Sequence, residues 1–194
     1  MSRFSDWLGK TFKGKRIAML GLAESGKTQF LSSLGCKDAI PGTPSNKDVY
    51  RWFKVSYPDI SVFVKAGCDY GGNKPIFTRT FIEALRTSDW VFFMVDIQKF
   101  IQNKVDSETG NPYKSLVLER LDFINSNVPA KFKDKLAIVL THADLMDDSE
   151  FFLVNEFRKY TSDKVYAVLT QHCYSLDAKD VNQVKTVFRR VAGI

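Results

Sequence analysis

The chain alternates between continuous apolar runs and segments with apolar residues at helical spacing. Residues 90–95 and 135–140 are apolar throughout, which is typical of parallel strands covered on both faces. Residues 27–34 instead place Phe30, Leu31 and Leu34 on one helical face. We expect strands at 15–20, 48–57, 60–66, 90–95, 135–140 and 164–169, and helices at 27–34, 76–86, 112–126, 149–160 and 180–191.

The order of these elements predicts an α/β fold. It has a mostly parallel six-stranded sheet with helices on both faces. Pro58 and Asp59 form a turn between 48–57 and 60–66, so these two segments are expected to make one antiparallel edge hairpin. Residues 97–111 are expected to form a long polar loop.

Composition places the chain among ordinary globular proteins. At 194 residues, with 44% hydrophobic and 26% charged residues, it suits one folded domain. It has neither a signal-peptide core nor an apolar run of membrane-spanning length. Cys36, Cys68 and Cys173 are scattered without zinc spacing, so we expect reduced thiols and a cytoplasmic protein, with peripheral membrane contact left open.

The basic character lies mainly at the N-terminus. Residues 1–16 carry +4 of the chain's net charge of +6, so nucleic-acid binding by the domain body is not indicated. Phe4, Trp7, Leu8 and Phe12 share one helical face, which predicts an amphipathic helix over 1–14 ahead of a domain at 15–194. The helix would pack on the domain, contact an anionic membrane weakly through 3–16, or bind a protein partner.

The most specific motif is Gly-Leu-Ala-Glu-Ser-Gly-Lys-Thr at 21–28, which fits the phosphate-binding loop G-x-x-x-x-G-K-[ST]. Gly21 and Gly26 let backbone N–H groups close around phosphates. Lys27 would reach the β- and γ-phosphates, and Thr28 would bind Mg²⁺. The predicted strand before the motif and the helix after it supply the context that this site requires. The predicted nucleotide contacts here are Gly21, Glu24, Ser25, Gly26, Lys27, Thr28 and Gln29.

Two later segments indicate a guanine base. Asp144 follows the strand 135–140, and its carboxylate could accept the two N–H groups that guanine presents and adenine lacks. Thr141 and His142 lie three and two residues ahead of Asp144, in place of the Asn and Lys of the base-reading motif of GTPases, which this segment resembles. Residues 173–175 (Cys173, Tyr174 and Ser175) follow the strand expected at 164–169, where GTPases place a small loop that contacts the guanine carbonyl, and this resemblance implies the same contact here. A solvated loop aspartate and a plain turn remain the alternatives for these two segments.

Two further segments would sense the γ-phosphate. Asp69-Tyr70-Gly71-Gly72 fits D-x-x-G, with Asp69 holding Mg²⁺ through water and the Gly72 N–H near the γ-phosphate. The turn 65–67 is the alternative register. Thr43, within Pro-Gly-Thr-Pro, would complete the Mg²⁺ shell, and a simple linker is the alternative. Asp96 ends the strand 90–95, where we expect a helix cap rather than a Mg²⁺ residue.

Together these motifs resemble the small GTPases with a P-loop G domain, and most closely the ADP-ribosylation-factor (Arf)-like branch. The likeness lies in Gly21-Leu22, in Ile40-Pro41 before Thr43, and in the Asp-Tyr-Gly-Gly form of 69–72. It implies a P-loop NTPase fold and a GDP/GTP switch with Mg²⁺. Effector, exchange-factor or activating proteins would read or control that switch.

One departure affects the expected rate of hydrolysis. Asn73 stands where the family carries a water-positioning glutamine, and its side chain is one methylene shorter. Because orienting the attacking water is a geometric task, we expect slow GTP hydrolysis with Lys27 and Asn73 as the catalytic residues. The alternatives are a pseudo-GTPase that binds nucleotide as an interaction module, and a P-loop ATPase or small-molecule kinase.

Overall fold

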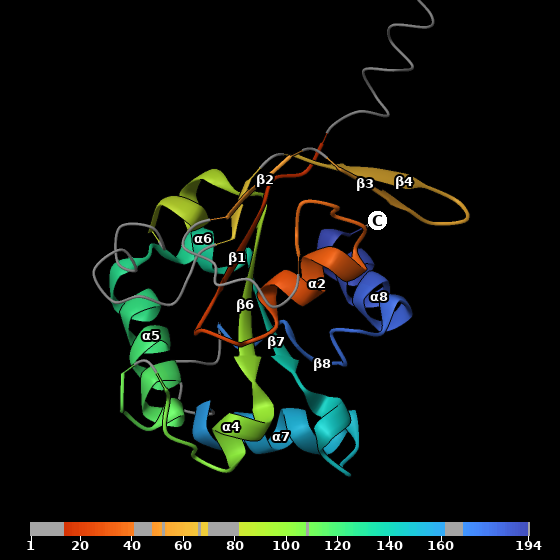
Figure 1. The fold of residues 1–194 in the computed structure, drawn as a ribbon. Coiled ribbons are helices and arrows are strands. Elements are labelled where there is room, and N and C mark those ends of the chain that lie inside the picture. Colours follow the sequence, from red (N-terminus) through yellow and green to blue (C-terminus); the bar gives the residue numbers. More distant parts are fainter. Residues whose placement is uncertain are drawn as a thin grey trace, which may run out of the picture.

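The computed structural model describes residues 14–40, 48–51, 53–65, 67–69, 82–107, 109–161 and 169–193. Its centre is a six-stranded sheet in the order β2-β5-β1-β6-β7-β8 (Figure 1). β1, β5, β6, β7 and β8 are parallel to one another, and β2 pairs antiparallel with β5 at one edge. The strands are β1 (Ile17–Gly21), β2 (Asp48–Tyr50), β5 (Gly67–Asp69), β6 (Trp90–Asp96), β7 (Leu136–Thr141) and β8 (Cys173–Ser175).

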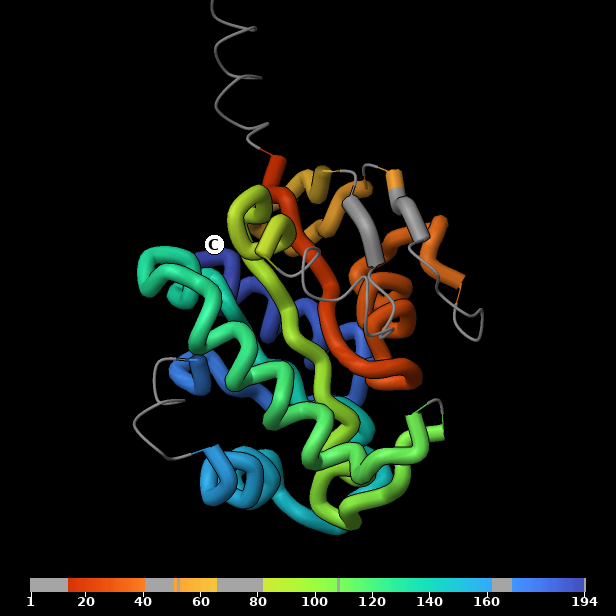
Figure 2. The backbone as a smooth tube through the Cα atoms, turned by 90° about the vertical axis from the view of Figure 1, so that its left-hand side faces the viewer, coloured from red at the N-terminus to blue at the C-terminus, as the bar shows by residue number. Residues whose placement is uncertain are grey.

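Helices cover both faces of this sheet, as the sequence predicts. Figure 1 shows α2 and α8 on one side and α5 with α6 on the other, and Figure 2 shows α5 running across its face in front of β6 and β1. The helices are α2 (Lys27–Ser33), α4 (Ile97–Ile101), α5 (Tyr113–Asn127), α6 (Ala130–Lys133), α7 (Glu150–Thr161) and α8 (Val181–Ala192), with a 3₁₀ turn η1 (Ala143–Leu145) and a helical segment at 82–87.

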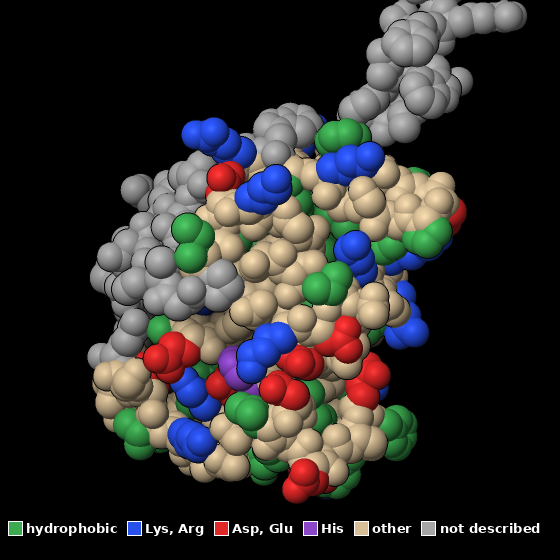
Figure 3. Space-filling view, turned by 45° about the vertical axis from the view of Figure 1, so that its right-hand side comes forward, with side chains coloured by type: hydrophobic (Ala, Val, Ile, Leu, Met, Phe, Trp, Pro, Cys, Tyr) green, Lys and Arg blue, Asp and Glu red, His purple; other side chains and the backbone are tan. Residues whose placement is uncertain are grey.

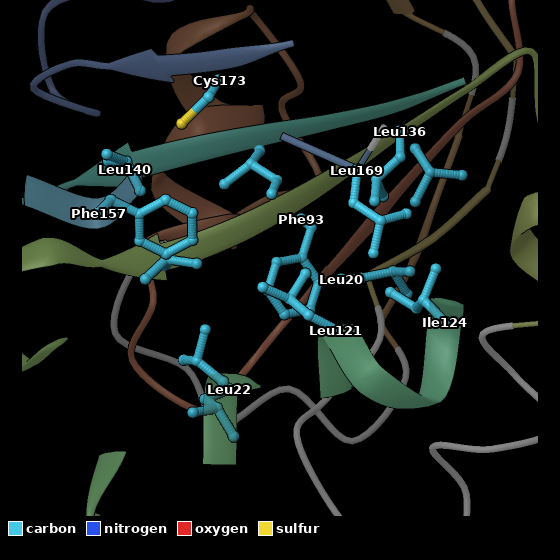
Figure 4. Packing of buried hydrophobic residues seen from close by; sticks show 14 of the residues in the cluster. Leu20, Leu22, Phe93, Leu121, Ile124, Leu136, Leu140, Phe157, Leu169 and Cys173 are labelled. Atoms are coloured by element: carbon cyan, nitrogen blue, oxygen red, sulfur yellow. The ribbon is translucent and has the colours of Figure 1, made fainter. Parts of the chain in front are cut away.

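Alternation along the central strands fills two separate hydrophobic layers. On β6, Phe93 and Val95 point into the layer under α4, α5 and α7, whereas Phe92 and Met94 point into the layer under α2 and α8. Figure 4 shows the first layer, with Phe93 between Leu20 of β1 and residues of α5. Side chains of β6 and β7 are therefore apolar on both faces, which explains the continuous runs in the sequence.

The predicted edge hairpin is only partly correct. Residues 48–57 do not run as one strand: β2 joins the main sheet, and β3 (Phe53–Ser56) pairs with β4 (Ser61–Val64) in a separate two-stranded sheet. The chain then returns to the main sheet as β5. The hairpin projects beyond the sheet edge, near the C-terminal end of α8 (Figure 1). Only β2 forms the antiparallel edge of the six-stranded sheet.

Two other regions differ from the expectation or lie outside the described residues. The sixth strand of the described sheet is β8 at Cys173–Ser175, whereas the strand expected at 164–169 lies outside the described residues except for residue 169. The loop expected at 97–111 begins with a short helix, α4, because Asp96 caps it: its carboxylate accepts a hydrogen bond from the Lys99 N–H at 2.9 Å. The cap assignment for Asp96 is thereby confirmed.

Several predictions concern residues that the structure does not describe. The N-terminal helix at 1–14 falls almost wholly within 1–13, and most of the helix expected at 76–86 falls within 70–81. Among the described helices, none combines the length and the apolar character needed to cross a membrane.

Candidate nucleotide-binding site

Four parallel strands have their carboxyl ends on the same side of the sheet, and predicted site residues lie at these ends or directly after them. Gly21 ends β1, Asp96 ends β6, Thr141 ends β7 and Ser175 ends β8. In register, Gly21 faces Met94 and Asp96 faces Thr141. The helix after β1 packs on one face, while the helices after β6 and β7 pack on the other. Ligands of open α/β sheets bind in the crevice at such a reversal.

The loop after β1 has the backbone of a phosphate cradle. Gly21, Glu24 and Gly26 adopt positive φ angles of 144°, 58° and 82°. Left-handed positions of this kind turn neighbouring N–H groups toward one side of a loop, which is the basis of anion-binding concavities. A side chain at Gly21 would place its Cβ 2.5 Å from the Met94 carbonyl oxygen, so only glycine fits. The close passage of β1 past β6 fixes where the loop begins.

Lys27 lies across this loop. Its side chain is buried, and its ammonium group donates to the carbonyl oxygen of Leu22 at 2.7 Å and to that of Gly21 at 3.4 Å. The carbonyl oxygens of Gly21 and Leu22 carry only partial negative charge, so a fully charged phosphate would attract the ammonium group more strongly. The lysine is thus oriented within the cradle before any ligand is bound.

Thr141 ties the end of β7 to the phosphate loop. Its side chain is completely buried, and its hydroxyl lies 3.0 Å from the Ser25 carbonyl oxygen and 3.2 Å from that of Val95. A Cβ on Gly26 would come within 3.3 Å of the Thr141 methyl group. The position of Thr141 indicates that it supports the phosphate loop.

His142 joins the same network through Asp96. It adopts a left-handed conformation with φ of 58°, and its Nδ1 lies 3.4 Å from a carboxylate oxygen of the buried Asp96. The Asp96 N–H donates to the hydroxyl of Tyr113, which comes from α5, at 2.9 Å. Burial raises the Tyr113 pKa, so the phenol stays neutral, and its oxygen accepts the hydrogen bond from the Asp96 N–H. His142 is thereby held at the rim of the crevice.

An ion pair joins α4 to the phosphate loop. The Lys99 ammonium lies 2.6 Å from the carboxylate of Glu24, which is itself mostly exposed. This hydrogen bond holds the Glu24 pKa below its usual value, so the pair stays ionised at neutral pH. An exposed pair contributes little to stability. It does position the residue with positive φ at the tip of the loop.

Asp144 lies in η1, directly after β7, with its side chain partly exposed. The ammonium group of Lys179, which follows β8, lies 3.8 Å from the Asp144 carboxylate. At this length the pair is weak and leaves the carboxylate accessible to a ligand. Asp144 and Lys179 thus bring the segments after β7 and β8 to the same side of the crevice.

Residues 173–175 form strand β8 and are not the predicted loop. Cys173 packs into the hydrophobic layer under α7, and burial raises the pKa of its thiol to about 12. The Ser175 hydroxyl is buried without a hydrogen-bond partner among the described residues. An orphaned buried hydroxyl at the site-facing end of a strand requires a water molecule or a ligand group. Any base contact must come from the end of β8 onward.

Three of the remaining predicted residues are described by the structure. Asp69 is the last residue of β5, while the alternative turn at 65–67 ends on the first residue of that strand, Gly67, so the backbone favours the Asp69 register. Gln29 bonds Ser33 along α2, with its amide nitrogen 3.3 Å from the hydroxyl. Thr28 is partly buried in the first turn of α2. Three predicted residues lie outside the described part of the chain: Thr43, Gly72 and Asn73. Within that part, no group of three His, Cys, Asp or Glu side chains could hold a metal ion.

Sequence reasoning did not find Lys99, Tyr113 or Lys179. Each acts through a partner distant in the sequence, namely Glu24, Asp96 or Asp144. No local spacing signals such a contact. The sequence shows Lys99 three residues after Asp96, but it does not show that Glu24 is the partner of Lys99.

The arrangement defines a P-loop nucleotide-binding fold of the α/β class. No protein-family model matches the sequence, and comparison with curated proteins gave no match. Among solved structures, bacterial selenocysteine-specific elongation factor EF-Sec is similar with a TM-score of 0.60 and 14% identity over 94% of this chain. This chain spans 29% of EF-Sec.

The second similar structure is the Arl6 BBS3 small GTPase from Trypanosoma brucei, solved with the bound nucleotide analogue GppNp. Its TM-score is 0.57 and its identity 16%, over 93% of this chain and 96% of that one. The chain therefore has the fold of a small-GTPase G domain. The Arf-like protein Arl6 is one of its structural neighbours.

Proposed function

We propose that the protein is a guanine-nucleotide switch that binds GDP and GTP with Mg²⁺ and hydrolyses GTP slowly. The observation that carries the proposal is the phosphate cradle at 21–28, in which Lys27 lies buried and oriented across a loop built on positive φ angles. The fold that it shares with two GTPase structures supports the same reading.

The phosphates would lie on the backbone N–H groups of the loop, with Lys27 along their β- and γ-oxygens. Thr28 begins α2 at the same loop, and Asp69 ends β5, the strand beside β1. Oxygen donors of this kind are those that Mg²⁺ prefers, and Thr28, Asp69 and Thr43 are the proposed residues. When bound, the ion would neutralise charge on the phosphate oxygens.

The base would lie against the segments that follow β7 and β8. Asp144 is the proposed guanine reader because its carboxylate remains accessible beside Lys179. His142 would form one wall of the base pocket, and the segment that follows Ser175 would form the other. Thr141 and Asp96 hold these parts in place and are not proposed to contact the nucleotide.

Hydrolysis would proceed by in-line attack of water on the γ-phosphate. Positioning supplies most of the rate in this reaction class. Asn73 would hold the water less well than a longer amide, so we propose a slow reaction that an activating protein accelerates. Slow hydrolysis is compatible with a switch, because the base and phosphate contacts alone would let the protein bind the nucleotide that partner proteins recognise.

The direct test is the identity and affinity of the bound nucleotide. The purified protein is denatured, and the released ligand is identified by anion-exchange chromatography. Fluorescent GDP, GTP and ATP analogues are then titrated with and without Mg²⁺. We expect guanine nucleotides to bind, ATP to compete poorly, and Lys27→Ala to lose at least about a hundredfold in affinity, since a charged hydrogen bond to phosphate disappears.

Lys131→Ala is the matched control, because it removes an exposed ammonium group on α6, away from the phosphate loop, and it should leave nucleotide affinity unchanged. Equal competition by ATP would show that Asp144 does not select guanine and would favour an ATPase. Guanine binding without hydrolysis in a single-turnover assay would favour the pseudo-GTPase. If no nucleotide binds, the proposal is wrong.

A further inference from the structure

A second concave site lies far from the phosphate loop, between the β3–β4 hairpin and α8. The cleft has a volume of ≈ 500 Å³, within the range of binding pockets. The hairpin supplies Tyr57 near its turn, and one face of α8 supplies Asn182, Lys185, Thr186, Arg189 and Arg190. None of the described residues of the nucleotide site belongs to it.

Contacts across the cleft fix its walls. The Tyr57 hydroxyl donates to the Lys185 carbonyl oxygen at 2.8 Å, and the Lys185 ammonium donates to the Ser56 carbonyl oxygen at 3.2 Å. Arg189 bonds both carboxylate oxygens of Asp59 and lies over the Tyr57 ring, 5.3 Å from its centre. A cleft whose walls are already held loses little entropy on binding.

The cleft is lined by donors and cations and by no carboxylate. Asp59 stands outside the lining and is engaged by Arg189, which holds the Asp59 pKa below its usual value. Lys185 keeps two N–H donors beyond its bond to Ser56. Arg190 is exposed, and no described carboxylate lies within ion-pair distance of it. Positive charge therefore remains available in a preformed concave site.

The acidic side chains on the face that Figure 3 shows lie mostly in its lower half, where basic side chains are mixed with them, while basic side chains predominate near the upper end, where the hairpin lies. A negatively charged partner therefore meets mostly basic side chains at the hairpin end of this face.

We propose that this cleft binds an acidic, extended peptide segment of a partner protein. Lys185 and Arg190 both line the cleft, and five residues separate them by about 7.5 Å along a helix and about 140° around its axis. Side chains on one face of an extended peptide recur about every 6.7 Å, so successive acidic residues can each pair with one of the two cations. The Asn182 and Thr186 side chains can bond the peptide backbone.

The charge argues against the chain's own N-terminal segment as the occupant. Residues 1–16 contain five basic residues and a single acidic one, Asp6. Placing this segment against Lys185 and Arg190 would bring like charges together. An acidic segment from another protein has the complementary charge. Because the site is concave, it suits an extended chain that enters the cleft better than it suits a flat protein surface.

The test uses a fluorescent peptide with glutamate at alternate positions, acetyl-Gly-Glu-Ser-Glu-Ser-Glu-Gly-amide, and the same peptide with glutamine in place of glutamate. Anisotropy is measured against the full chain at low salt. We expect saturable binding of the glutamate peptide only, weakened as salt screens the charges. Arg190→Glu and Lys185→Gln should each weaken binding about tenfold or more, with circular dichroism confirming that both variants fold.

Lys131→Glu is the matched charge reversal, because Lys131 is exposed on α6, away from the cleft. It should leave peptide affinity within about twofold. Lys27→Ala should also bind the peptide normally, which separates this proposal from nucleotide binding. Failure of the glutamate peptide to bind overturns the proposal. Equal loss in Lys131→Glu, or displacement by millimolar inorganic phosphate or by anionic vesicles, overturns it in favour of general anion attraction.

Discussion

Thr141 links two segments of the candidate site through its buried hydroxyl group. From the sequence it was assigned to base contact, since it stands three residues before Asp144. In the structure its hydroxyl is buried between the carbonyl oxygens of Ser25 and Val95. It has one proton for two acceptors, and it also lies 3.2 Å from His142 Nδ1. The residue joins the phosphate loop to the base segment.

We predict that Thr141→Val weakens both stability and nucleotide binding. Valine keeps the shape but removes the hydroxyl, which leaves a buried carbonyl group of the loop without its donor. Such a loss costs about 1–3 kcal/mol in unfolding free energy. Because the loop is then held less firmly, nucleotide should dissociate faster. Urea unfolding and the release rate of a fluorescent GDP analogue would measure the two effects.

Thr141→Ser is the control for this prediction, since serine retains the hydroxyl and loses only the methyl group. It should keep the nucleotide release rate close to that of the parent protein. If serine speeds nucleotide release and valine does not, the methyl contact with Gly26, and not the hydrogen bond to Ser25, determines the loop geometry.

At the scale of elements, β8 is the strand that sequence patterning could not locate. It has three residues, its burial alternates, and its neighbours include polar side chains. In register, Cys173 faces Ile138 and Ser175 faces Leu140, both on β7. The placement of Cys173 within a strand makes a chemical prediction, because a loop at the crevice mouth would leave its thiol exposed.

We predict that native Cys173 resists iodoacetamide at pH 8. Burial holds its thiol pKa at about 12, and the thiolate is the reactive form. The raised pKa also contributes stability below pH 9, the usual thiol value, and that contribution is lost as pH rises from about 9 to about 12. Mass spectrometry after brief alkylation would locate the modified cysteines.

Unfolding the chain in guanidinium before alkylation supplies the control, because Cys173 should then react fully. Cys36 is also buried, in the opposite hydrophobic layer, and should be protected in the same way. Rapid native labelling of Cys173 with protection of Cys36 would place residues 173–175 in an exposed loop, against the strand assignment.

The elements that sequence predicted well are those that carry their own signal. β6 and β7 are apolar on both faces, and α5, α7 and α8 begin and end within a residue or two of the expected positions. The phosphate loop likewise is local, since its glycines and lysine are adjacent in the chain. These features depend on neighbours within one helix turn or one strand.

The failures share a different cause. The break between β2 and β3 arises where β2 pairs with β5, a segment almost 20 residues further along. α4 depends on the Asp96 cap inside an otherwise polar stretch, and a five-residue helix leaves almost no periodic pattern. The Glu24–Lys99 pair and the Asp96–Tyr113 bond join distant segments, so tertiary packing alone creates them.

At the scale of the whole molecule, one sheet carries two hydrophobic layers with different neighbours. Phe92 stands between Phe30 of α2 and Phe188 of α8, with ring centres 5.4 and 6.1 Å away. Phe93, the next residue, points into the opposite layer under α5. α2 begins at Lys27, so the layer around Phe92 supports the helix that follows the phosphate loop, whereas the layer around Phe93 meets the loop at Leu22.

We therefore predict that Phe92→Leu and Phe93→Leu destabilise the fold alike but differ in their effect on nucleotide. Each should lower the unfolding free energy by about 1–2 kcal/mol, because leucine leaves a small cavity in a packed core. Since the layers share one sheet, each variant should still unfold in a single transition, coincident by circular dichroism and fluorescence. Phe92→Leu should speed GDP release severalfold because its ring packs against Phe30 and α2 loses that support, whereas Phe93→Leu should speed it by a smaller factor because its layer meets the loop at Leu22 and not at α2. Equal acceleration in both variants would mean that the loop responds to overall stability and not to the layer beneath it.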